Sequence, residues 1–140
     1  MSATVVQHYL RRATDFLDGM SYMTEEETVA QSSALLAVHA AISYTDALRV
    51  GLREGKVTGD DHRLAADELE SLLNHKRYAD RSGLRHLRGL ISKKSDIAYG
   101  RGNVRFQDCQ NLVFKAKNFA AWANKMGSDL KIEGWRDGSE

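Results

Sequence analysis

Proline is absent from this 140-residue chain, and cysteine occurs only once. Without proline the chain lacks its strongest helix breaker, which favours long helices joined by glycine-containing turns. A lone Cys109 excludes a disulfide within the chain, and its place in an apolar stripe indicates an inert core thiol. The spacings of known metal sites are also missing: no histidine follows a glutamate by three residues, and HExxH does not occur. We therefore expect neither a metal nor a cofactor.

Long apolar runs are missing as well. No segment approaches the ~20 apolar residues that span a bilayer. Near the start of the chain His8, Arg11, Arg12 and Asp15 interrupt any apolar stretch, unlike the pattern of a signal peptide. These features predict a cytoplasmic protein without a membrane segment.

Apolar residues recur with helical periodicity along most of the chain. The pattern predicts five helices, over about 4–20, 24–50, 60–74, 84–100 and 104–126. Thr24 and Glu27 form a capping box for the second of these, which is apolar on nearly all sides and is therefore the central helix. We expect an all-α, up-and-down bundle of four to five helices over residues 1–126. Residues 127–140 are expected to form a flexible tail, docked at most through Trp135.

The fourth predicted helix carries a lysine in the middle of its apolar face. Lys94 shares that face with six apolar residues: Leu84, Leu87, Leu90, Ile91, Ile97 and Ala98. A buried ammonium is costly unless a partner meets it. One candidate is Asp46, which lies in a polar stripe with His39 and Ser43 on the central helix. Two interpretations remain open: an Asp46–Lys94 ion pair between the helices, or a half-exposed stripe satisfied by water.

Charge is distributed unevenly. Residues 15–70 hold twelve acidic and four basic residues, a net of −8, whereas residues 75–105 hold nine basic and two acidic residues, a net of +7. The two halves either neutralise each other within the fold, or the basic half binds phosphate, nucleic acid or an acidic partner. Tyr78 and Tyr99 are available there for stacking on bases. The candidate binding residues are Arg85, Arg88, Lys93, Lys94, Arg101 and Arg105.

Three segments together resemble a HEPN domain: AAISYTDALRVG, GDDHRLAADELESLL and LISKKSDIAYG. The resemblance covers residues 24–126. It implies a helical bundle that is usually dimeric. Many members are ribonucleases with an arginine followed, four to six residues later, by a histidine near the end of a late helix, and two such motifs face each other in the active dimer. In this chain Lys94 occupies the arginine position and Tyr99 the histidine position.

Both departures weaken the case for catalysis. Histidine exchanges a proton near neutral pH, with a pKa of ~6.5, whereas the pKa of tyrosine is ~10. Lysine lacks the planar fork with which arginine grips a phosphate. We therefore predict a non-catalytic HEPN-like binding or interaction module with a phosphate- or RNA-friendly basic site. Its partners are predicted to be RNA, a nucleotide or another protein.

The resemblance also implies a homodimer. The apolar surplus on the central helix and the misplaced lysine predict a dimer face formed largely by the second and fourth helices, with Asp46, Lys94 and Tyr99 lining the seam. The alternative is a metal-independent ribonuclease of the toxin–antitoxin type. Its candidate catalytic residues are Lys94 and Tyr99, assisted by Ser43 or Asp46.

Overall fold

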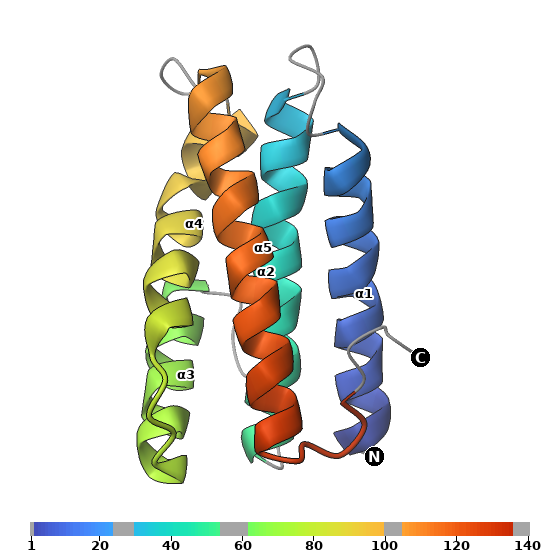
Figure 1. The fold of residues 1–140 in the computed structure, drawn as a ribbon, viewed down its shortest axis with the longest axis vertical. Helices are drawn as coiled ribbons and strands as arrows, with labels where there is room; N and C mark the ends of the chain where they lie inside the picture. Colours follow the sequence, from blue (N-terminus) through green and yellow to red (C-terminus); the bar gives the residue numbers. More distant parts are fainter. Residues whose placement is uncertain (1, 24–29, 54–61, 100–104, 136–140) are drawn as a thin grey trace.

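Five helices form the protein (Figure 1). The structure, a computed structural model, describes residues 2–23, 30–53, 62–99 and 105–135. The helices are α1 (Ser2–Met23), α2 (Ala30–Arg53), α3 (His62–Lys76), α4 (Ser82–Tyr99) and α5 (Phe106–Asp129). The predicted all-α bundle is confirmed, and α5 extends three residues beyond the expected end at 126. The capping box expected at Thr24 lies outside the described residues.

One helix departs from the expected up-and-down order. Ala65 lies beside Ile42 and Thr45, and Glu68, one turn further along α3, bonds Arg49 of α2. Residue numbers therefore rise together on the two helices, so α3 runs in the same direction as α2. Figure 1 shows α3 beside the lower part of the bundle, where α4 begins.

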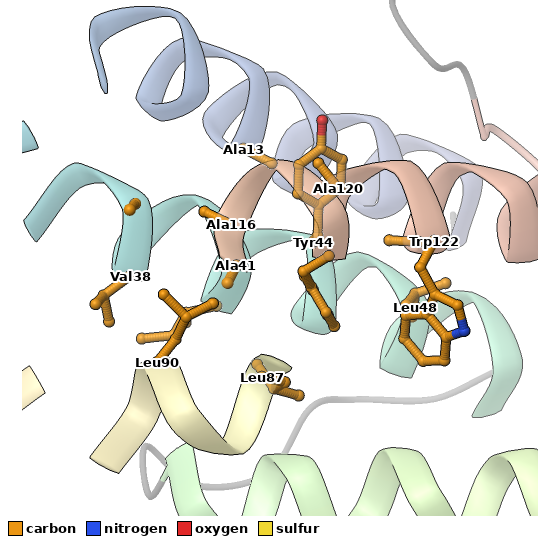
Figure 2. Close-up of a cluster of buried hydrophobic side chains, with 14 of the residues drawn as sticks. Ala13, Val38, Ala41, Tyr44, Leu48, Leu87, Leu90, Ala116, Ala120 and Trp122 are labelled. Atoms are coloured by element: carbon orange, nitrogen blue, oxygen red, sulfur yellow. The ribbon is translucent and has the colours of Figure 1, made fainter. Parts of the chain in front are cut away.

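The central position predicted for α2 is confirmed. This helix packs against α1, α3, α4 and α5, and buries residues on most of its sides. Figure 2 shows Tyr44 and Leu48 of α2 among Ala13 of α1, Ala120 of α5 and Leu87 of α4. The small alanine side chains let neighbouring helices approach closely, and the larger side chains fill the remaining space at the density of a protein core.

The turn before α4 sets the position of that helix against α5. The Asp80 carboxylate accepts hydrogen bonds from the backbone N–H and hydroxyl of Ser82, at 3.0 and 2.7 Å, which lowers its pKa. The Asp80 carbonyl accepts the indole N–H of Trp122 at 3.1 Å. The Tyr78 hydroxyl donates to Asp129 at 2.9 Å, and burial together with this bond raises the pKa of Tyr78 to about 12. Tyr78 is thus engaged in the fold and is not free to stack on a base.

The segment after α5 crosses the end of the bundle towards the start of α1 (Figure 1). Trp135 packs over Gly127 and donates its indole N–H to Asn124 at 3.2 Å. Ile132 is buried against Gly51 of α2. Docking only through Trp135 was therefore an incomplete expectation, since Ile132 contributes a second anchor. Within the described ranges, none of the helices is long and apolar enough to cross a bilayer.

Candidate functional site

Lys94 lies where the sequence places it, on the apolar face of α4. Its neighbours along that face, Leu90 one turn before and Ile97 one turn after, are both buried. Lys94 itself is half-buried. A lysine can cover apolar surface with its four methylenes while its ammonium reaches towards water, so half-burial is a tolerable state for this side chain.

The predicted ion pair between Asp46 and Lys94 is wrong for the single chain. Asp46 is bonded to Arg49 at 3.2 Å, and no salt bridge among the described residues joins it to Lys94. Arg49 lies one turn further along the same helix, so its guanidinium reaches Asp46 without any contact between helices. The other expected assistant, Ser43, is buried, and among the described residues no hydrogen bond or salt bridge joins either residue to Lys94.

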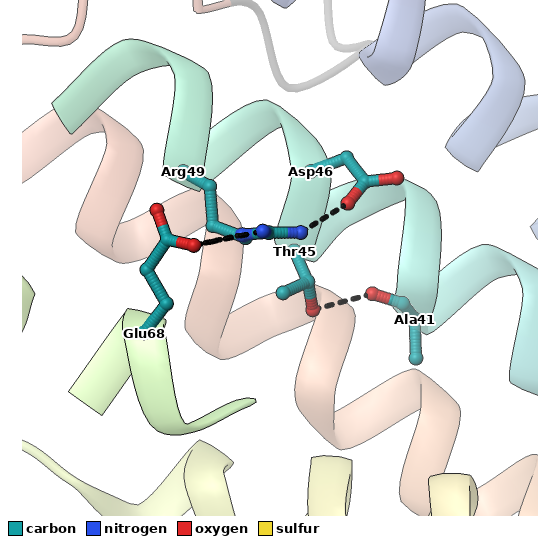
Figure 3. Close-up of polar contacts among 5 residues, drawn as sticks. All are labelled: Ala41, Thr45, Asp46, Arg49 and Glu68. Atoms are coloured by element: carbon teal, nitrogen blue, oxygen red, sulfur yellow. Dashed lines mark hydrogen bonds and ion pairs between the residues drawn. The ribbon is translucent and has the colours of Figure 1, made fainter. Parts of the chain in front are cut away.

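Arg49 is the buried cation that sequence reasoning missed. Its side chain is 3% exposed. Figure 3 shows the guanidinium between two carboxylates: Nε and Nη2 donate to Glu68 of α3 at 3.2 and 2.8 Å, and Nη1 donates to Asp46. A guanidinium in this setting is satisfied by charged hydrogen bonds and ties α3 to α2. The signal was available, because Arg49 stands among Ala47, Leu48 and Val50 on the apolar central helix.

Two of the remaining candidates, Arg101 and the side chain of Tyr99, lie outside the described residues. Arg105 precedes α5, and its backbone N–H and guanidinium donate to Asp108 at 3.2 and 3.5 Å. These bonds, helped by the nearby charge of Lys93, lower the pKa of Asp108.

Cys109 is buried, and burial raises the pKa of its thiol, which confirms the inert thiol expected from the sequence.

The basic residues of α4 divide between its two flanks. On the flank facing α3, Arg88 bonds Asp67 at 2.7 Å and Glu70 at 3.4 Å. Here the acidic and basic halves of the chain neutralise each other, as one of the two interpretations predicted. Arg88 is consequently not an unpaired cation.

On the flank facing α5 the cations are not neutralised in this way. Lys115 of α5 lies over Gly89, with its Nζ 3.1 Å from where a β-carbon on that glycine would be. Burial, followed by the charges of Arg85 and Lys115, lowers the pKa of His86. Lys93 lies near enough to Asp108 to lower its pKa. We call Arg85, His86, Lys93 and Lys115 the basic seam.

The basic seam carries a net charge of +3 with His86 neutral. Arg85, Lys93 and Lys115 each contribute one charge, while Arg105 and Asp108 cancel each other. None of the three cations forms a salt bridge within the described parts of the chain, whereas Arg49, Arg88, Arg105 and Lys125 all do. The sequence-based candidates did not include Lys115, because they came from the basic half of the chain, residues 75–105, and Lys115 lies beyond it.

Among the residues that the structure describes, no group of three or more metal-ligating side chains comes together. Comparisons of the chain with protein-family models, with curated proteins and with solved structures found no match. The candidate site therefore rests on its own geometry: three cations without a salt bridge, which lie along the junction of two antiparallel helices.

Proposed function

We propose that this protein is a HEPN-like helical binding module that holds the phosphates of single-stranded RNA on the basic seam. The observation that carries the proposal is the grouping of Arg85, Lys93 and Lys115 without carboxylate partners. Like charges held side by side repel each other, and a bound polyanion relieves that repulsion while it releases its own counterions.

An exposed aromatic side chain adds to this surface. Phe114, the residue before Lys115, is 65% exposed on α5. Single-stranded nucleic acids stack their bases on aromatic rings beside a basic groove. In this proposal Phe114 takes the stacking role that the sequence analysis gave to Tyr78 and Tyr99.

A homodimer is part of the proposal. It is supported by Lys94, whose side chain is half-buried on an apolar helix face and forms no salt bridge with any carboxylate of the described residues. The dimer face predicted on the second and fourth helices is limited to α4, because α2 is enclosed by the other four helices. In a dimer built on α4, a second subunit would supply the acidic partner. Sedimentation equilibrium at high protein concentration tests this part, and a strict monomer would contradict it.

The RNA-binding part is tested by the salt dependence of affinity for a single-stranded oligonucleotide, followed by fluorescence anisotropy. Three phosphate contacts predict a slope of about −2 in log K against log salt concentration, at ~0.7 per contact. Lys93→Gln and Lys115→Gln should each lower the slope by ~0.7. Lys76→Gln is the matched control, because Lys76 is exposed at the end of α3, outside the basic seam and away from Phe114. Equal slopes for all three variants would refute the proposal.

Incubation with RNA separates binding from the ribonuclease alternative. Cleavage that persists in the presence of a chelator and is lost in Lys94→Ala would replace the binding module with a metal-independent nuclease. Intact RNA, bound with the predicted salt dependence, supports the binding module.

A further inference from the structure

A cavity of about 250 Å³ opens between α3 and α4, on the flank of α4 opposite the basic seam. Ala66 and Ile91 give it an apolar surface, and Asp67, Arg88 and Ser92 supply polar groups. Beneath it Ile42, Thr45 and Leu87 pack with no room for a water molecule. The cavity is therefore an open site with a closed, apolar floor.

The polar groups of the cavity leave one strong acceptor available. Arg88 donates to Oδ1 of Asp67 at 2.7 Å. The second carboxylate oxygen, Oδ2, accepts no hydrogen bond from the described residues, and the Asp67 side chain is 63% exposed. An ionised carboxylate only accepts hydrogen bonds, so this oxygen selects a ligand group that donates one.

The cavity and the basic seam are separated only by the width of α4. The residue between them on the outer surface of the helix is Gly89, which presents no side chain and lies under Lys115. An α-helix with its side chains is ~10 Å across, so a strand crossing at Gly89 passes from one site to the other within a few nucleotides.

We propose that this cavity receives one unpaired base with an exocyclic amino group, from the RNA strand whose phosphates lie on the basic seam. This inference rests on the proposed function. The volume suits a single flat ring system, and the apolar floor of Ala66 and Ile91 accepts its face. The amino group of cytosine donates to a carboxylate, whereas uracil presents a carbonyl oxygen at the same position. Cytidine is therefore preferred over uridine.

The test compares three probes in the same anisotropy assay: a cytidine homopolymer, a uridine homopolymer of equal length, and inorganic polyphosphate as a competitor. The wild-type protein should bind the cytidine polymer about tenfold more tightly than the uridine polymer, the size of one good base contact. Ser92→Phe places a ring over the cavity from an exposed position and should reduce this ratio to about one. Ser71→Phe is the matched control, an exposed serine on α3 outside the cavity, and should keep the ratio.

Asp67→Ala provides a second variant. This substitution should also abolish the cytidine preference. The released Arg88 raises the affinity for every polyanion, but the ratio of the affinities for the cytidine and uridine polymers is independent of that gain. Salt-dependent binding without a cytidine preference, or a preference that survives in Ser92→Phe, would overturn the base site and leave the proposed function standing. Absence of binding to all three probes would overturn both.

Discussion

The two glycines of α4, Gly83 in its first turn and Gly89 in its interior, should respond in opposite ways to substitution by alanine. A β-carbon on Gly83 would overlap the indole ring of Trp122. That ring is almost fully buried, packs on Phe119 with ring centroids 5.4 Å apart and donates to Asp80. Displacing it costs ~1 kcal/mol for the hydrogen bond and ~1–3 kcal/mol for overpacking, against a gain of up to ~1 kcal/mol in helix propensity. Gly83→Ala should therefore destabilise the fold by about 2 kcal/mol.

Gly89→Ala is the matched comparison on the same helix. Its β-carbon would meet only the Nζ of Lys115 at 3.1 Å, the far end of a flexible side chain that moves aside at little cost. The propensity gain then dominates, and the fold should become more stable by ~0.5–1 kcal/mol. Urea unfolding followed by circular dichroism measures both free energies. Equal shifts, or a stable Gly83→Ala variant, would refute the close packing of α4 on Trp122.

Three further predictions concern charged groups. Arg49→Ala should lower the free energy of unfolding by about 3 kcal/mol, because two partly buried carboxylates lose their partner; unchanged urea unfolding would mean that the cluster contributes nothing. His86→Gln should flatten the dependence of stability on pH. The folded pKa of His86 lies below the unfolded value of ~6.5, so the wild type loses stability as pH falls from that value towards the folded pKa, and urea midpoints that run parallel in both proteins would contradict this. Lys94→Met should leave the stability of the monomer equal or slightly higher, because an apolar head replaces a half-buried ammonium; a loss above ~2 kcal/mol in thermal unfolding would reveal a partner within the chain.

Helical periodicity was sufficient to predict an all-α bundle of five helices, but not the direction of every helix. The sequence separates five amphipathic segments, and the bounds of α1 and α5 differ from the expected ends by two to three residues. The direction of α3 was not accessible in this way, because periodicity defines which face of a helix is buried but not which way the chain returns to it. Gly51 and Ile132 illustrate the same limit, since a contact between a helix and a distant segment leaves no local pattern.

The two helical cations show what the sequence could and could not predict about the candidate site. Arg49 and Lys94 both stand on apolar faces, and both require an explanation. The sequence predicted a paired cation at Lys94, whereas the paired cation is Arg49. A lysine stem extends its ammonium towards water, whereas the guanidinium of Arg49 is buried and depends on Asp46 and Glu68.

Asp46 bonds Arg49 on its own helix, and no salt bridge of the described residues joins it to Lys94. Like the cations of the basic seam, Lys94 has no salt bridge to a carboxylate in the described part of the chain. On α4, Arg88 faces α3 and stabilises the fold through its ion pairs with Asp67 and Glu70. Arg85 and Lys93, which form no salt bridge with a described carboxylate, define the surface on which binding has to be tested.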